Sequence, residues 1–97
     1  YLAPEVIKGG KPDTRVDIYA AGITLYKLLT RHFPVVGTTA SEIMEAHLKV
    51  RVPDVTEFNP AVTAGVQSVL ENALAKDPDK RYQSAAEFKR DYLQAVR

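Results

Sequence analysis

Very few side chains in this sequence have the type and spacing that catalysis requires. His32 and His47 lack the spacing of metal ligands, and we interpret both as surface or packing residues. Without cysteine, the chain has no thiolate nucleophile and no cysteine-based metal site. Its serines do not lie in a nucleophile-elbow motif, and Ser84 is most simply a helix cap. The sequence therefore predicts no catalytic, cofactor-binding or metal-binding residue of its own.

Asp17 is the ionisable residue with the most unusual sequence context, because an apolar segment follows it directly. One interpretation is that its carboxylate interacts with the positive end of a helix dipole, which contributes roughly 0.3–1 kcal/mol. An acid beside so apolar a helix also calls for more than one partner, and residue type alone does not identify the others.

The helix that positions Asp17 is predicted over residues 14–31, with Asp13 or Thr14 as its cap. Between Val16 and Leu29, apolar residues occur on every face of a helical wheel, which is typical of a buried helix. The segment is shorter than the roughly 20 apolar residues that span a bilayer. Gly22 costs about 1 kcal/mol relative to alanine in mid-helix, so we expect another segment to approach the backbone there.

Three further helices are predicted in residues 32–97, and capping-box patterns at 39–42 and 84–87 begin the first and the last of them. The first ends near Val50, and the second lies within residues 62–75. No segment of strand length alternates between apolar and polar residues, so the predicted fold class is all-α. In the first helix, Ile43, Ala46 and Val50 are expected to face the core, and His47 is open between this stripe and the exposed face. The core positions expected in the other two helices are Val66, Val69, Leu70, Ala73 and Leu74 in the second, and Phe88, Tyr92, Leu93 and Val96 in the last.

Composition limits the class of protein and its partners. A chain of 97 residues forms one small domain, and 13 basic against 12 acidic residues leave a formal charge of +1. The two signs are mixed along the chain, so a nucleic acid or an anionic membrane is not the expected partner. The absence of cysteine suits a reducing compartment.

Four motifs, in the right order, resemble those of protein kinases. The first is Ala3-Pro4-Glu5, the motif that closes the kinase activation segment. The second and third, residues 17–22 and 25–30, are similar to the kinase F helix. The fourth, residues 73–82, resembles the Lys-Asp-Pro-x-x-Arg-Tyr turn near the end of the large lobe. The sequence has no Trp, which the tyrosine-kinase versions of these motifs usually carry.

The chain therefore resembles the C-terminal part of the large lobe of a bacterial-type Ser/Thr protein kinase. Residues 1–97 correspond to a partial kinase domain running from the F helix to the I helix of an incomplete kinase fold. By this resemblance, residues 1–13 are the end of the activation segment and a loop, and one helical turn is expected near Pro4. The buried F helix is 14–31, and 32–97 hold three further helices and their connectors.

The resemblance also implies roles for particular residues. Glu5 and Arg81 match a buried ion pair, for which the planar guanidinium fork is well suited. Asp17 matches the aspartate that anchors the catalytic loop through hydrogen bonds. The segment Tyr1, Leu2, Ala3 and Pro4 is a candidate part of the substrate-docking pocket, and the helix at 39–50 is a frequent docking surface in the family. Its Glu42, Glu45, His47 and Lys49 are expected to be exposed.

Two departures from the family pattern follow the central helix. Arg31 stands where the family usually has glycine, and Val35 replaces the phenylalanine of a Pro-Phe pair. Ala20-Ala21 also replaces the common Ser-Leu. Packing at this corner is therefore expected to differ from that of other members.

The machinery of phosphoryl transfer is missing from these residues. There is no Gly-rich loop, no His-Arg-Asp and no Asp-Phe-Gly, so the chain alone is predicted to be inactive, with ATP and Mg²⁺ belonging to the intact parent. The alternative is a stand-alone, non-catalytic helical interaction module. A DNA-binding helix-turn-helix is disfavoured by the balanced charge.

The resemblance finally implies partners and a location. The expected partners are the rest of the kinase domain and, in the parent, a protein substrate. Without the catalytic loop, one face of the central helix should be uncovered near Asp17, and such a patch could mediate self-association. The expected location is the cytoplasm, with a membrane anchor elsewhere in the parent as a further expectation.

Overall fold

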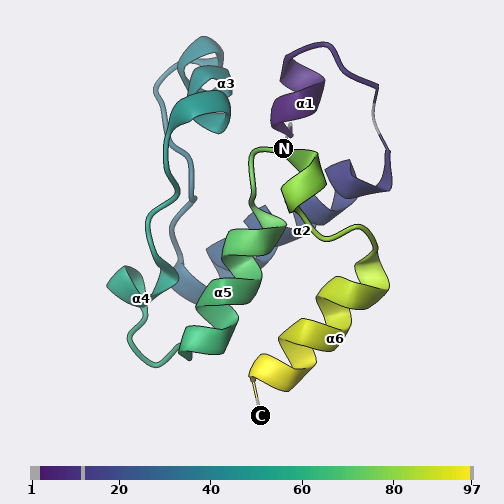
Figure 1. The fold of residues 1–97 in the computed structure, drawn as a ribbon. Coiled ribbons are helices and arrows are strands. Elements are labelled where there is room, and N and C mark those ends of the chain that lie inside the picture. The colour runs from purple at the N-terminus through teal and green to yellow at the C-terminus, as the bar shows by residue number, and fades with distance from the viewer. Residues whose placement is uncertain (1–2, 12, 97) are drawn as a thin grey trace.

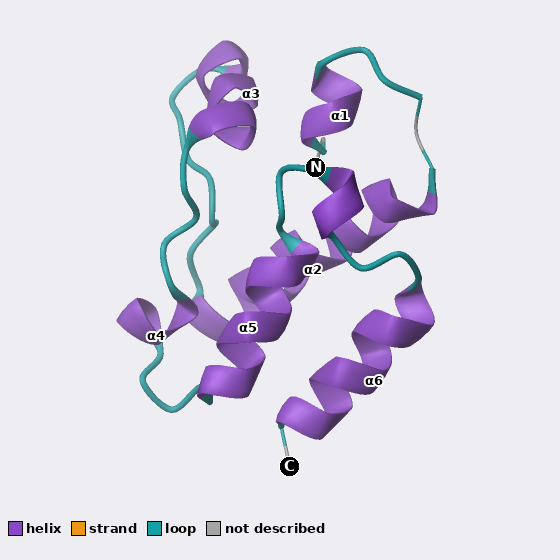
Figure 2. Ribbon diagram, viewed as in Figure 1, coloured by secondary structure: helices purple, strands orange, loops and turns teal. Residues whose placement is uncertain are grey.

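The structure is a computed structural model, and it describes residues 3–11 and 13–96. All regular structure in these residues is helical, which confirms the all-α fold class (Figures 1 and 2). None of the helices in this described part is long and apolar enough to cross a membrane. The elements are α1 (Pro4–Ile7), α2 (Thr14–Thr30), α3 (Ala40–Lys49), α4 (Val55–Phe58), α5 (Ala64–Ala73), the 3₁₀ turn η1 (Pro78–Lys80) and α6 (Ala85–Ala95).

The central helix α2 forms as predicted, and Asp13 is its cap. The Asp13 carboxylate accepts a hydrogen bond from the Arg15 backbone N–H at 2.8 Å. The expected close approach at Gly22 is confirmed: a Cβ placed there would lie 3.0 Å from Leu74 Cδ2 and 3.1 Å from the Ala73 Cβ. Glycine therefore lets the end of α5 pack directly on the α2 backbone.

The prediction that α2 is buried on every face is wrong for this chain by itself. Asp17, Ala21, Thr24 and Leu28 form an exposed stripe, and Leu28 is 73% exposed. The physical reason is the flat shape of the molecule, whose principal-axis extents are 38 × 28 × 16 Å. Since one helix with its side chains is 10–12 Å across, the short dimension is too thin to cover α2 on both sides. An uncovered face of this helix was expected from the resemblance.

The other face of α2 packs on α5, and α6 packs on both helices. The predicted core face of α5 is confirmed, because Val66, Val69, Leu70, Ala73 and Leu74 are all buried. In α6, Phe88 and Tyr92 are partly buried and pack against the core, whereas Leu93 and Val96 are exposed. The outer half of the predicted α6 face therefore does not belong to the core.

Helix α3 lies apart from this core, at the end of two connectors that run side by side (Figure 1). Thr39 caps it by accepting from the Glu42 backbone N–H at 3.1 Å. Its buried residues are Ala46 and His47, whereas Ile43 and Val50 are exposed. The predicted core stripe is thus wrong at Ile43 and Val50, because α3 contacts the core only through a narrow part of its surface.

Helix α4 was not predicted from the sequence. It is a single turn in which Val55 is buried, and the Asn59 side chain that follows it donates to the Leu29 carbonyl oxygen at 2.9 Å. His32 stacks on Phe58 with ring centroids 4.2 Å apart. These contacts fix the connector between α3 and α5 to the C-terminal end of α2.

Candidate functional site

The structure brings Glu5 and Arg81 together. Arg81 Nη1 lies 2.7 Å from Glu5 Oε2, and Nη2 lies 3.0 Å from Oε1, so the ion pair is bidentate. Glu5 belongs to the short helix α1, and Arg81 directly follows η1. Arg81 is 2% exposed. The pair therefore joins α1, near the start of the chain, to the turn that precedes α6.

Backbone carbonyls complete the surroundings of the Arg81 guanidinium. Its Nε and Nη2 donate to the Ala75 oxygen at 3.0 and 2.8 Å, and Nη1 donates to the Arg15 oxygen at 2.9 Å. Together with the Glu5 contacts these bonds engage all five N–H groups of the side chain. The Tyr19 ring adds a cation–π contact, with Arg81 Cζ 5.0 Å from its centroid. A charge this deeply buried is stable only when it is paired and hydrogen-bonded in this way.

The electrostatics of Glu5 combine two opposing effects. Burial by itself raises the pKa of the Glu5 carboxyl, but the hydrogen bonds and the charge of Arg81 outweigh it, so the pKa lies below its ordinary value. Glu5 is therefore ionised at neutral pH. The pair is a structural clamp, since both groups are fully engaged with each other and with the backbone.

Asp17 lies on the exposed stripe of α2. Its carboxylate makes no hydrogen bond or ion pair to a side chain or backbone group within residues 3–11 and 13–96. It borders a hollow of about 400 Å³ between α2 and α6, which Ala21 and Phe88 also line. The dipole interpretation accounts for its position in the first helical turn. The anchoring interpretation requires a partner segment outside this chain and stays a prediction.

The candidate docking segment is only partly described. Tyr1 and Leu2 lie outside the described residues. Ala3 is 0% exposed and belongs to the main core cluster, and Pro4 is also buried. The side chains of Ala3 and Pro4 therefore pack into the lobe and cannot contact a substrate directly.

The sequence left His47 open between the core stripe and the exposed face of α3, and the structure places it on the core side. It is 5% exposed, and its Nδ1 is 2.8 Å from the Tyr19 hydroxyl oxygen. Glu42, Glu45 and Lys49 are exposed as expected. The signal available in the sequence was the helical spacing of His47 relative to Ile43 and Val50. The partner Tyr19 lies 28 positions away, and nothing local pointed to it.

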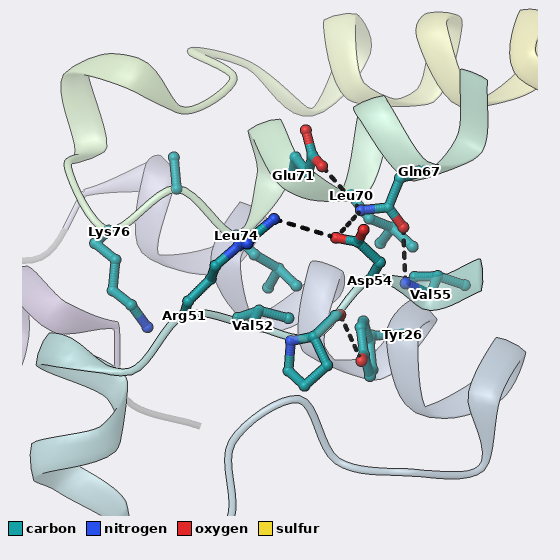
Figure 3. A pocket seen from close by; sticks show the side chains of 12 residues that line it. Tyr26, Arg51, Val52, Asp54, Val55, Gln67, Leu70, Glu71, Leu74 and Lys76 are labelled. Atoms are coloured by element: carbon teal, nitrogen blue, oxygen red, sulfur yellow. Dashed lines mark hydrogen bonds and ion pairs between the residues drawn. The ribbon is translucent and has the colours of Figure 1, made fainter. Parts of the chain in front are cut away.

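A polar-rimmed hollow of about 350 Å³ lies between α5 and the connector that leads to α4 (Figure 3). The Gln67 amide dominates its rim: Oε1 accepts from the Val55 N–H at 2.7 Å, and Nε2 donates to Glu71 at 2.9 Å and to Asp54 at 3.3 Å. On the floor, the Tyr26 hydroxyl donates to the Pro53 oxygen at 2.7 Å. Burial, with Glu57 and Asp54 nearby, raises the pKa of Tyr26 to about 12. These polar groups bind one another, so they serve to fasten α4 to α5.

The described part of the chain contains no group of three or more His, Cys, Asp or Glu side chains that could hold a metal ion. The residues here do not fit a nucleotide or Mg²⁺ site of the kinase type either, because none of the motifs that would bind these groups is present. The described residues contain a buried ion-pair clamp and an uncovered face of α2.

Comparisons with known proteins agree with this architecture. The family model described as protein kinase domain matches residues 1–93. The serine/threonine-protein kinase PrkC of Bacillus subtilis is 40% identical over 91 residues, which cover 94% of this chain and 14% of that protein. The DNA damage-responsive serine/threonine-protein kinase RqkA of Deinococcus radiodurans is 43% identical over 86 residues, covering 89% of this chain and 13% of that protein.

Solved structures give the same result. The kinase domain of Mycobacterium tuberculosis PknI superposes with a TM-score of 0.78 at 29% identity, covering 98% of this chain and 34% of that one. The chain thus spans about a seventh of the curated relatives it matches and about a third of a solved kinase domain.

A flat helical half-lobe built on one central helix and closed by a Glu–Arg clamp is the C-terminal part of a kinase large lobe. The chain belongs to the protein kinase family, and its relatives are bacterial serine/threonine kinases.

Proposed function

We propose that the parent protein transfers the γ-phosphoryl group of ATP to serine or threonine side chains of proteins, and that this chain is its structural half-lobe. The observation that carries the proposal is the 40% identity to a serine/threonine kinase over 91 residues. The complete Glu5–Arg81 clamp, in its family position, supports it further. ATP and Mg²⁺ would bind to parts of the kinase domain outside these residues.

Within that domain the chain would supply two things. The first is a scaffold, because the exposed face of α2 offers Asp17 and an apolar surface to the catalytic loop. The second is part of the substrate-docking surface, formed by the segment before Pro4 and by the exposed side of α3. We expect the domain to be cytoplasmic, where ATP is available, and a membrane anchor elsewhere in the parent remains an expectation.

The test is a phosphoryl-transfer assay on the full kinase domain encoded with this chain. With Mg²⁺ and labelled ATP, the domain should label itself or a generic protein substrate on serine or threonine. The isolated 97 residues should label nothing. Failure of the full domain to transfer phosphate under any of these conditions would contradict the proposal.

The exposed apolar face of α2, with Leu28 73% exposed, favours one alternative: a non-catalytic interaction module that binds another chain or a second copy of itself. The coding sequence that precedes these residues separates the two, because a kinase needs His-Arg-Asp and Asp-Phe-Gly there. Size-exclusion chromatography of the isolated chain tests self-association. A monomer at high concentration would count against it.

A further inference from the structure

The position of α3 depends on a small number of contacts. The two connectors place it away from α5 and α6, and the helix packed against it is α1 (Figure 1). Its buried part is limited to Ala46 and His47. The Lys76 ammonium adds one long hydrogen bond, 3.4 Å, to the Ala46 carbonyl oxygen. We therefore expect the orientation of α3 to depend on the few contacts made by Ala46 and His47.

The strongest of these contacts is polar and buried. His47 Nδ1 lies 2.8 Å from the Tyr19 hydroxyl oxygen, and the two rings meet edge to face with centroids 5.7 Å apart. Tyr19 is 0% exposed and sits on α2, whose own position is fixed by the core. A buried hydrogen bond of this length holds two groups in a defined geometry, because leaving either one unpaired is costly.

Tyr19 also contacts the Glu5–Arg81 clamp. The Arg81 guanidinium lies over the Tyr19 ring, at 5.0 Å from its centroid, and the same guanidinium binds Glu5 of α1. A continuous series of contacts therefore runs from His47 on α3, through Tyr19 and Arg81, to Glu5 on α1. One end of this series is on α3, which was assigned above to substrate docking, and the other end is on α1.

We propose that His47 is a positioning residue for protein substrates: its hydrogen bond to Tyr19 locks α3 to the Glu5–Arg81 clamp, so that the docking helix α3 and α1 keep one relative orientation. The proposal rests on the proposed kinase function for its catalytic readout. Neither His47 nor Tyr19 touches the reacting atoms in this role, and their effect passes through α3.

The groups around the hydrogen bond between His47 and Tyr19 favour a neutral His47. Burial and the nearby Lys76 ammonium lower the pKa of His47, and Arg81 adds a second positive charge on the far side of the Tyr19 ring. Glu5 is the carboxylate at the end of this series, and Arg81 already binds both of its oxygens. Burial also raises the pKa of Tyr19 to about 12, so its hydroxyl keeps its proton. Protonation of His47 would place an uncompensated cation in the contact, and α3 should release below about pH 6.5, where a free histidine becomes charged.

The experiment compares four single variants of the full kinase domain, and the double variant Tyr19→Phe/His47→Phe, with the wild type. Tyr19→Phe and His47→Phe each remove the bond while keeping an aromatic ring. His47→Asn keeps a polar group near the position of Nδ1 but cannot titrate. Tyr82→Phe is the matched control, because it removes a buried tyrosine hydroxyl that bonds Asp91 at 3.0 Å, away from α3.

Hydrogen–deuterium exchange gives a readout that needs no kinase activity. Amides of residues 40–49 should exchange about 3- to 10-fold faster in Tyr19→Phe and His47→Phe, the factor expected for one net hydrogen bond. The double variant should add nothing further, whereas His47→Asn and Tyr82→Phe should leave these amides unchanged. In the wild type the same amides, relative to those of α5, should lose protection between pH 7.5 and pH 5.5.

Steady-state kinetics then test the role in catalysis. The KM for a protein substrate should rise about 3- to 10-fold in the two lock-breaking variants, while the KM for ATP and kcat stay the same. At acid pH the KM of the wild type for the protein substrate should approach the KM of the two lock-breaking variants. The KM of His47→Asn should not change with pH. Unchanged exchange of residues 40–49 would overturn the lock, whether or not the domain is active. Faster exchange with an unchanged KM would overturn its role in substrate positioning, and an inactive domain with faster exchange would count only against the proposed kinase function.

Discussion

Arg81 binds both oxygens of Glu5 at 2.7 and 3.0 Å, although the two residues are 76 positions apart in the sequence. The partners are not equivalent. Arg81 also holds the backbone oxygens of Arg15 and Ala75, whereas Glu5 has Arg81 as its ion-pair partner among the described residues. The guanidinium therefore connects three separate backbone segments, and the carboxylate supplies the charge that allows it to be buried.

Breaking this pair should be among the most damaging single changes in the chain. Arg81→Ala and Glu5→Ala are each expected to lower the free energy of unfolding of the kinase domain by roughly 3–5 kcal/mol, because each leaves a buried group without its partner. Arg81→Lys should rescue little, since an ammonium cannot reproduce the five-donor fork. Urea unfolding followed by circular dichroism measures the change.

A double-mutant cycle separates the pair from its surroundings. The double variant should cost clearly less than the sum of the two single changes, as expected for residues in direct contact. Asp79→Ala is the matched control, because it removes an exposed carboxylate that contacts Arg15 at 2.8 Å. This control should have little effect on stability. A coupling energy near zero between Glu5 and Arg81 would show that the ion pair does not stabilise the domain.

The lowered pKa of Glu5 also predicts how stability depends on pH. A carboxyl whose pKa is lower in the folded state stabilises the fold above its unfolded pKa of about 4.3, and this contribution is lost as the pH falls through the folded value. The domain should therefore lose stability below about pH 4, and part of that loss should come from Glu5. Glu5→Gln tests the assignment, because its deficit relative to the wild type should shrink as the medium becomes more acidic. A deficit that stays constant from pH 7 to pH 3 would exclude it.

Local sequence patterns predicted the helices that have a cap or a regular apolar spacing. They did not predict features that depend on contacts between residues far apart in the sequence. Helices α2, α5 and α6 begin at the predicted caps or within two residues of the predicted limits, because Asp13 and Ser84 act through nearby backbone groups. The buried position of His47 depends on Tyr19, which only the tertiary fold brings near. Helix α4 is one turn held by contacts from α2 and α5, so it lacks a periodic signal. The Glu5–Arg81 pair could be anticipated only because the motifs resemble a known family.

Val35 stands where the family usually has phenylalanine, and the structure has space beside it for a larger side chain. Val35 is buried beside a mostly apolar hollow of about 270 Å³, also lined by Ile23, Pro34 and Ile43. Val35→Phe should stabilise the domain by about 1 kcal/mol, since it buries more apolar surface without displacing a neighbour. Val66→Phe, in the close-packed main core, should instead cost about 1–3 kcal/mol. Thermal unfolding of both variants checks this contrast, and a destabilised Val35→Phe would mean that the hollow closes in solution.

Arg31 ends α2 in a conformation that suits glycine better. Its φ of 62° and ψ of 15° place it in the left-handed region, where a residue with a Cβ loses about 1–2 kcal/mol. Arg31→Gly should therefore raise the free energy of unfolding by about 1 kcal/mol. The control is Lys8→Gly, because Lys8 ends α1 with φ −75° and glycine there only adds flexibility to the unfolded chain. Equal effects of the two changes would show that backbone strain at Arg31 is absent.

Asp17 offers a prediction in which stability and activity separate. Because its carboxylate is exposed and makes no hydrogen bond or ion pair within the described residues, Asp17→Asn should lower the free energy of unfolding of the isolated chain by no more than the roughly 0.3–1 kcal/mol of a helix-dipole interaction. In the full kinase domain the same change should lower kcat by about 100-fold, the size of effect expected when an anchored catalytic loop is displaced by about 1 Å. Asp79→Asn, at another exposed carboxylate, should change neither quantity. If Asp17→Asn leaves kcat intact, the carboxylate interacts only with the helix dipole. The exposed face of α2 would then hold the rest of the domain by its apolar residues alone.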